Sequence, residues 1–420
     1  MSNVHAMKKF TLLTVSLSAL LALPLAALAA TSQDWPSWRG PTRNGIATPG
    51  QHPPTQWSET ENIVWKATIP GRGHSSPTVV GDRIYLATAD PVHLSQSVLC
   101  LDRKTGKQLW QSVLHASDGD PGKQAHSSAA SGTVAYDADR LFISFLNGGA
   151  VFTTCLDLQG QQVWQQKICN FVTHQGYAAS PVVYKNLILV SADHKGAGTI
   201  TALDRSTGKP VWSEPRPKLP NYTTPSILEV AGRTQMVLAG CNLVSSFDPL
   251  TGKKLWEIPG STEECVVTAV TDGKRVFVSG GWPKNHAMAV EADGSGKVAW
   301  QNTARVYVPS MIAKDGYLYA VMDAGLAVCW KGETGEELWK ERLGGDFFAS
   351  PVMVNDHIYA SNVNGKTFVF EATPKTFKLI ASSQLGNEAY ASPVVCGDRV
   401  YLRVAVKGDQ RQEFLYCVGK

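Results

Sequence analysis

The sequence lacks the cysteine patterns that mark haem, zinc and redox sites. It has eight cysteines, but no two are adjacent and no pair has the spacing C-x-x-C. A C-x-x-C-H haem motif and a C-x-x-C redox motif are therefore both absent. Half of the cysteines fall at matching places of a repeated unit, which predicts small buried core residues. These four are Cys100, Cys155, Cys329 and Cys417.

An excess of charge of either sign is also missing. The formal net charge is only +4 at pH 7. Such a balance predicts neither a nucleic-acid partner nor a membrane-surface partner. After residue 30, no apolar run is long enough to span a bilayer, so no transmembrane anchor is expected in the body of the chain.

The one long apolar run lies near the N-terminus, from Phe10 to Ala30, after two lysines. It ends in Ala27-Leu28-Ala29, a small-residue cleavage site. This pattern predicts a cleaved secretory signal peptide over residues 1–29. The alternative, a membrane anchor, is disfavoured because Pro24 interrupts the run. No cysteine follows the site directly, so we expect an exported, periplasmic or extracellular protein without a lipid anchor. An oxidising compartment permits disulfides, but the cysteine spacing assigns none.

A ten-residue motif recurs along the rest of the chain. Its first copy reads Leu101-Asp-Arg-Lys-Thr-Gly-Lys-Gln-Leu-Trp110. Glycine supplies the positive φ of a tight turn, and aspartate can bond the backbone ahead of it. The tryptophan is too large for one small sheet to bury, so a neighbouring sheet must cover it. The tryptophans predicted to pack in this way are Trp65, Trp110, Trp164, Trp212, Trp256, Trp300 and Trp339.

A β-hairpin precedes each copy of the motif. The first runs Ser75-Ser-Pro-Thr-Val-Val-Gly-Asp-Arg-Ile-Tyr, two apolar strands joined by a polar turn. Each unit thus holds four strands: two in the hairpin, one ending at the aspartate and one ending at the tryptophan. The hairpins begin at Ser76, Ser131, Ser180, Thr224, Thr268, Ser310, Ser350 and Ser392.

The two ends of the chain complement each other. The eighth unit has three strands before the chain stops, and the strand at Trp65 has no preceding unit. Joining them would leave no open edge. We therefore predict an all-β fold over residues 62–420, an eight-bladed β-propeller of four-stranded antiparallel blades, closed by the N-terminal strand completing the last blade. A linear solenoid, the alternative, would need caps. Residues 30–61 are predicted to form an irregular lead-in, a strap on the folded body.

The repeated motif resembles the tryptophan-docking repeat of the quinoprotein (PQQ-type) propellers, over nearly all of residues 62–420. One branch of that family is the PQQ-dependent alcohol and sugar dehydrogenases. The other is non-catalytic and includes the outer-membrane assembly factor BamB. In the alcohol dehydrogenases the resemblance implies a PQQ beside a disulfide ring of adjacent cysteines, a Ca²⁺ held by clustered oxygens and an aspartate base. This chain has no adjacent cysteines and no Asp-Asn-Glu grouping.

The resemblance therefore implies a non-catalytic binding or scaffold protein of the cell envelope, similar to the BamB branch. We expect no catalytic residues, no metal and no cofactor. The expected partner of the monomer is an envelope protein or a small ligand at the channel mouth. Two alternatives stay open: a PQQ-dependent alcohol or sugar dehydrogenase with a reduced site, holding PQQ and calcium, and a glycan- or peptide-binding module.

The segments before the hairpin starts are predicted to approach the channel axis, where a rigid scaffold positions functional loops. Their residue types indicate a ligand pocket with aromatic walls. Alternatively, the loops fill the channel mouth with their own side chains. Zinc or copper would suit the three histidines among them, but these have different offsets from the hairpin starts. The candidate ligand-binding residues are His74, His126, His174, Tyr177, Tyr222, Glu264, Arg305, Tyr307, Phe348 and Tyr390.

Overall fold

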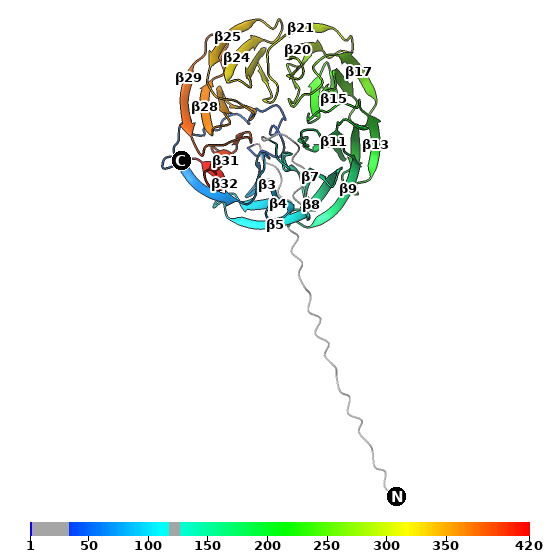
Figure 1. The fold of residues 1–420 in the computed structure, drawn as a ribbon, viewed down its shortest axis with the longest axis vertical. Helices are drawn as coiled ribbons and strands as arrows, with labels where there is room; N and C mark the ends of the chain where they lie inside the picture. The colour runs from blue at the N-terminus through cyan, green and yellow to red at the C-terminus, as the bar shows by residue number, and fades with distance from the viewer. Residues whose placement is uncertain (2–32, 117–126) are drawn as a thin grey trace.

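The computed structural model describes Met1 and residues 33–116 and 127–420. The predicted signal peptide, apart from Met1, and the candidate His126 lie outside the described residues. The described part of the chain contains 32 strands and no helix, so no helix in it could cross a membrane. The strands form eight four-stranded sheets arranged as blades around a central axis, as Figure 1 shows. The predicted eight-bladed propeller is confirmed.

We number the blades from the first sheet that is continuous in the chain. Blade 1 consists of β2 (Thr78–Val80), β3 (Arg83–Asp90), β4 (Ser95–Asp102) and β5 (Gln108–His115), and blade 2 of β6 (Ala135–Asp137), β7 (Arg140–Asn147), β8 (Ala150–Asp157) and β9 (Gln162–Asn170). Blade 3 consists of β10 (Val182–Tyr184), β11 (Leu187–Ala192), β12 (Thr199–Asp204) and β13 (Pro210–Pro215), and blade 4 of β14 (Ser226–Val230), β15 (Arg233–Gly240), β16 (Leu243–Phe247) and β17 (Lys254–Pro259).

Blade 5 consists of β18 (Val270–Thr271), β19 (Arg275–Gly280), β20 (His286–Glu291) and β21 (Val298–Asn302), and blade 6 of β22 (Ile312–Lys314), β23 (Tyr317–Val321), β24 (Leu326–Lys331) and β25 (Glu337–Arg342). Blade 7 consists of β26 (Val352–Val354), β27 (His357–Ser361), β28 (Lys366–Glu371) and β29 (Leu379–Gln384), and blade 8 of β30 (Val394–Val395), β31 (Val400–Lys407), β32 (Arg411–Val418) and β1 (Ile63–Ile69). The last strand of each blade lies at the rim, where Figure 1 labels β5, β9, β13 and β17.

The ring closes through strands from the two ends of the described chain. β1 pairs antiparallel with β32, and Ile63 and Trp65 lie opposite Val418 and Cys417. Blade 8 therefore combines three C-terminal strands with one N-terminal strand, as the sequence predicts. Every outer strand then has a sheet partner on its inner side, and the ring has no open end.

The repeated turn explains the spacing that recurs within the motif. In its first copy, Asp102 Oδ1 accepts hydrogen bonds from the Thr105 backbone N–H at 2.8 Å and from the Thr105 hydroxyl at 2.7 Å. Gly106 follows with a φ of +72°, and a Cβ there would lie 2.6 Å from the indole of Trp65. Glycine is thus required twice, for the turn and for the neighbouring indole.

The tryptophan of one blade lies against the motif of the next. Trp65 Nε1 donates to the carbonyl of Arg103 in blade 1 at 3.0 Å, and Trp164 Nε1 donates to that of Arg205 in blade 3 at 3.0 Å. Trp256 differs, since its Nε1 bonds Gln235 of its own blade at 2.7 Å. Five tryptophans lie within 3 Å of the position where a Cβ of the next glycine would be: Trp65, Trp110, Trp164, Trp212 and Trp300.

Hydroxyl groups at the hairpin starts link neighbouring blades around the axis. The Ser350 backbone N–H donates to Ser392 Oγ at 2.8 Å, and the Ser392 N–H donates to Ser76 Oγ at 3.1 Å. In blade 2 the linking hydroxyl belongs to Thr133, two residues after the predicted start at Ser131. Seven such links join described residues. The recurring Ser or Thr therefore links seven of the eight neighbouring pairs of blades, all but blades 4 and 5.

We expect Ser350→Ala to lower the free energy of unfolding by about 1–2 kcal/mol, because it leaves the buried Ser310 N–H without its acceptor. Urea unfolding monitored by circular dichroism measures the change. Ser206 lies in an exposed turn, and Ser206→Ala should change stability by less than about 0.5 kcal/mol. Equal effects of the two substitutions would contradict a stabilising role for the hydroxyl groups that link neighbouring blades.

The segment from residue 33 to residue 57, which we call the strap, crosses the end of the ring that carries the hairpin turns. Figure 1 shows it in dark blue, running from the rim to the centre. Trp35 forms a bridge with Val79 of blade 1, and Ile46 forms one with Met353 of blade 7. The buried Arg39 guanidinium donates to backbone carbonyls in blades 6 and 7. Arg43 also donates to the Val183 carbonyl of blade 3 at 2.7 Å, so the strap joins blades 3 and 7, which lie on opposite sides of the axis.

Candidate functional site

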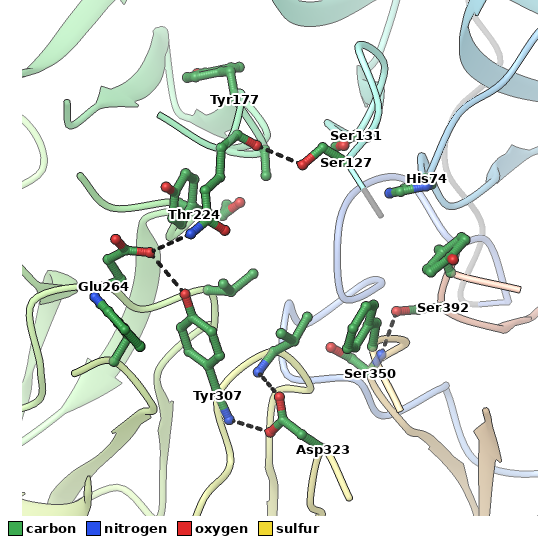
Figure 2. Close-up of a pocket in the computed structure, with 18 of the residues that line it drawn as sticks. His74, Ser127, Ser131, Tyr177, Thr224, Glu264, Tyr307, Asp323, Ser350 and Ser392 are labelled. Carbon is green, nitrogen blue, oxygen red and sulfur yellow. Dashed lines mark hydrogen bonds between the residues drawn. The ribbon is translucent and has the colours of Figure 1, made fainter. Parts of the chain in front are cut away.

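A cavity of about 850 Å³ lies on the axis of the ring, and the strap closes one end of it. Loops from all eight blades contribute to its lining, and Figure 2 shows part of it. Its floor includes the indole of Trp38 from the strap, whose Nε1 donates to Thr268 Oγ1 at 2.8 Å. Because the strap closes this end, the cavity opens on the opposite face. A volume of this size is typical of small-molecule sites.

One side of the cavity carries a buried carboxylate, that of Glu264. Its side chain is 1% exposed. It accepts hydrogen bonds from the Tyr307 hydroxyl at 3.0 Å and from Gln175 Nε2 at 3.3 Å, and His174 Nδ1 lies 3.4 Å away. Burial raises the pKa of the Glu264 carboxyl above its usual range. The Glu264 carboxylate is thus held by a tyrosine hydroxyl and a glutamine amide, with an imidazole beside it.

A second carboxylate, that of Asp323, lies at the other end of Tyr307, where it bonds the backbone rather than the hydroxyl. Figure 2 shows Glu264, Tyr307 and Asp323 together along the left and lower part of the cavity. Asp323 accepts the backbone N–H groups of Tyr307 at 2.7 Å and Val308 at 3.3 Å. Burial outweighs these hydrogen bonds and raises the pKa of Asp323 to about 6. We call Glu264 and Asp323 the acidic wall.

Aromatic rings form the other side, which we call the aromatic wall: His74, Phe348 and Tyr390. The rings of His74 and Tyr390 have centroids 4.4 Å apart, and those of Phe348 and Tyr390 have centroids 5.9 Å apart. In Figure 2 His74 lies on the right, across the cavity from Glu264. The Tyr390 hydroxyl donates to Glu388 at 3.4 Å, which orients the ring from behind.

The mouth of the cavity carries the largest exposed group of the lining. Trp282 is 54% exposed. Arg305 lies with its guanidinium carbon 5.4 Å from the centroid of the Tyr307 ring and donates to the Gly281 carbonyl at 3.1 Å. The mouth therefore offers an apolar surface next to a cation that is already held by its neighbours.

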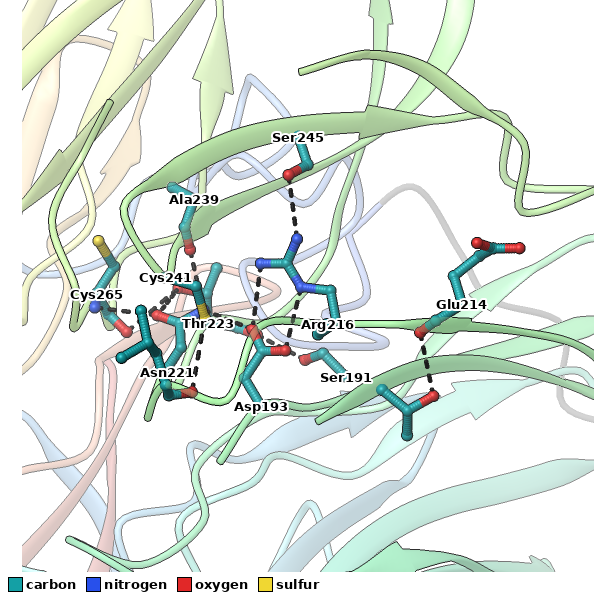
Figure 3. A network of polar contacts seen from close by, with 12 residues as sticks. Ser191, Asp193, Glu214, Arg216, Asn221, Thr223, Ala239, Cys241, Ser245 and Cys265 are labelled. Carbon is teal, nitrogen blue, oxygen red and sulfur yellow. Dashed lines mark hydrogen bonds and ion pairs between the residues drawn. The ribbon is translucent and has the colours of Figure 1, made fainter. Parts of the chain in front are cut away.

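A buried polar network supports the loops behind the acidic wall (Figure 3). Arg216 and Asp193 form an ion pair at 3.1 Å, with both side chains 1% exposed. Asn221 donates to Asp193 at 3.0 Å, and its own Oδ1 accepts the Cys265 backbone N–H at 3.0 Å. Since Cys265 follows Glu264 directly, this network fixes the loop that presents the Glu264 carboxylate.

The structure places nine of the ten candidate residues in the lining of this one cavity. The tenth, His126, lies outside the described residues. The nine are His74, His174, Tyr177, Tyr222, Glu264, Arg305, Tyr307, Phe348 and Tyr390. Within the described residues, no three His, Cys, Asp or Glu side chains are placed to share a metal ion.

Sequence reasoning missed a second set of lining residues. Lys195, Trp282 and Asp323 each lie in the loop after the second strand of a blade. The second strand of each blade ends on the side of the ring where the cavity opens. The loop after it therefore lies near the axis, as the segment before the hairpin start does. The signal was available in the repeat, because each of these residues lies two or three positions after an apolar strand. Trp38 was also missed, since the strap has no counterpart in the repeat.

Comparison with known proteins finds similarity to both branches of the quinoprotein-like propellers. The profile of the family described as outer membrane protein assembly factor BamB matches residues 54–116, 94–341 and 283–375. BamB of Burkholderia pseudomallei is 28% identical over 275 residues, which cover 57% of this chain and 68% of the relative. A 1-butanol dehydrogenase (quinone) of Thauera butanivorans is 27% identical over 241 residues, covering 51% of this chain and only 37% of that enzyme.

Solved structures share the architecture. BamB from Moraxella catarrhalis superposes with a TM-score of 0.61 at 15% identity, covering 84% of this chain and 96% of that one. A quinohemoprotein alcohol dehydrogenase from Comamonas testosteroni gives a TM-score of 0.65 at 14% identity, covering 94% and 82%. At such identities the likeness concerns the fold alone.

Proposed function

Because the chain belongs to the family described as outer membrane protein assembly factor BamB, we propose that it is an exported, non-catalytic binding protein of the cell envelope. The observation that supports this proposal is the cavity, which gathers loops from every blade around one open mouth. A scaffold of packed blades presents the loops at this mouth as a fixed surface to a partner. The partner is an envelope protein or a small ligand that enters the mouth.

The chemistry of the lining argues against the dehydrogenase alternative. The described lining holds four carboxylate side chains and two that carry a fixed positive charge, Lys195 and Arg305. PQQ is a polycarboxylate, which a net acidic cavity repels unless a Ca²⁺ lies between them, and no three His, Cys, Asp or Glu side chains of the described residues are placed to hold that ion. The eight cysteines are all free, and no two are adjacent in sequence. The residues present therefore do not fit this cofactor, and we derive no reaction through it.

A paired test separates binding from catalysis. The mature protein incubated with PQQ and Ca²⁺ should give no dye-linked oxidation of 1-butanol above the protein-free background. In parallel, a photo-crosslinking residue replaces Trp282 at the mouth or Lys104 in a Thr-Gly turn on the strap side. Crosslinked envelope partners are expected from position 282 and not from position 104. Alcohol oxidation, or equal crosslinking from both positions, would contradict the proposal.

A further inference from the structure

We infer that the cavity binds an organic cation, an ammonium or guanidinium group, between the acidic wall and the aromatic wall. This inference rests on the proposed binding function and adds the class of ligand. It is carried by three independent features: an open cavity of about 850 Å³, an unbalanced negative charge in its lining, and an aromatic surface opposite that charge.

The carboxylates of the acidic wall are buried, so water screens their negative charge poorly. Asp323 is 8% exposed, and Arg305 acts on its charge only from beyond ion-pair distance. Glu264 has one ion-pair neighbour among them, His174 at 3.4 Å. An ionised carboxylate in a buried site is costly unless a cation neutralises it. A ligand cation in the cavity, near either carboxylate, would supply the missing charge.

The aromatic wall suits the same ligand. The faces of aromatic rings attract cations, and the attraction grows where water is excluded. Phe348 and Tyr390, which precede blades 7 and 8, offer such faces, and the His74 ring packs against Tyr390. Both walls therefore favour positive charge, one through carboxylates and the other through ring faces. Neither favours an anion.

The space available limits the form of the ligand. A single ammonium ion would leave most of the cavity empty, whereas a guanidinium on an alkyl chain reaches from the mouth to the walls. Such a group can come from an arginine side chain of a partner protein or from a free amine. The recognition chemistry is the same for both, so the experiment includes one probe for each source.

Isothermal titration of the mature chain tests the inference. The probes are a capped Gly-Arg-Gly peptide, the same peptide with citrulline in place of arginine, and agmatine. Citrulline has nearly the shape of arginine but no charge. We expect the arginine peptide to bind at least about tenfold more tightly than the citrulline peptide. Agmatine binding as tightly as the peptide would indicate a free amine as the source, and weaker binding would indicate a side chain.

Two variants locate the binding in the cavity. Glu264→Gln and Asp323→Asn keep hydrogen-bond acceptors for their neighbours and remove the charge, and each should weaken binding of the arginine peptide about tenfold. Asp356→Asn is the matched control, because that side chain is 79% exposed and lies outside the cavity, and it should leave binding unchanged. Thermal unfolding of each variant establishes that it is folded.

The affinity for the arginine peptide should also decrease as the pH is lowered. The pKa of Asp323 is raised to about 6 and only its ionised form attracts a cation, so affinity is retained above pH 6 and lost below it. Between pH 8 and pH 5 we expect a loss of about tenfold. Arg305 and the backbone N–H groups of Tyr307 and Val308 face Asp323, and His174 faces Glu264.

Three results would overturn the inference: equal affinity for the arginine and citrulline peptides, no binding of any cationic probe, or full affinity in both cavity variants. The citrulline comparison uses the unaltered protein, so it stands even if a variant fails to fold. If partners still crosslink at position 282 while the cations fail to bind, the ligand class is wrong and the binding function survives. Oxidation of 1-butanol would instead refute the binding function itself.

Discussion

Trp65→Ala is expected to lower the free energy of unfolding by about 3–5 kcal/mol. Trp65 is 9% exposed and lies in the strand that closes the ring, opposite Cys417. Its indole packs against Gly106 of blade 1 and donates to the Arg103 carbonyl. Alanine would leave a cavity at the junction of blades 8 and 1 and an acceptor without its donor. Urea unfolding followed by circular dichroism measures the loss.

Trp282→Ala is the control, since it removes the same side chain from an exposed position. It should change stability by less than about 0.5 kcal/mol, because Trp282 is 54% exposed. If both variants lost the same stability, the packing of Trp65 between blades would not hold the ring closed.

Arg403→Met should cost about 2–4 kcal/mol, because it removes one cation from a buried ion pair and leaves Glu413 with Arg411, at 2.8 Å, as its remaining ion-pair partner. Arg403 Nε donates to Glu413 at 2.7 Å, and both side chains are almost fully buried. Arg403 Nη1 also donates to the Ala87 carbonyl of blade 1 at 2.7 Å. The guanidinium thus bridges the same junction that Trp65 covers, but from the cavity side.

The matched substitution for Arg403 is Lys378→Met, which removes a cation paired with Glu371 at the surface. The Lys378 side chain is 64% exposed, so its loss should cost less than about 1 kcal/mol. Chemical denaturation at neutral pH compares the two. A small effect of Arg403→Met would mean that β1 and β32 alone hold the ends together.

The fold could be predicted from sequence because its determinants are local and repeated. An aspartate, a Thr-Gly turn and a tryptophan recur in each unit, and each has a physical reason to be there. The closure could also be predicted, since the strand at Trp65 and the three-strand last unit complement each other. The pairing of Trp65 with Cys417 confirms it.

The cavity could be predicted only in part. The segments before the hairpin starts led to nine of its lining residues, but Asp323 and Lys195 come from loops after second strands. The position of Trp38 could not be predicted, because its hydrogen bond with Thr268 joins residues 230 positions apart and depends on the path of the strap. The charge of each side chain follows from the sequence. The excess of acidic side chains in the cavity does not, because it depends on which loops the fold brings together.

The central claim is that the axial cavity is an acidic binding site rather than a quinone site. Equilibrium titration of the mature chain with the capped Gly-Arg-Gly peptide and with PQQ plus Ca²⁺, in one buffer at pH 7.5, tests it most directly. The account predicts saturable binding of the peptide and none of PQQ. Saturable binding of PQQ with no response to the peptide would contradict it.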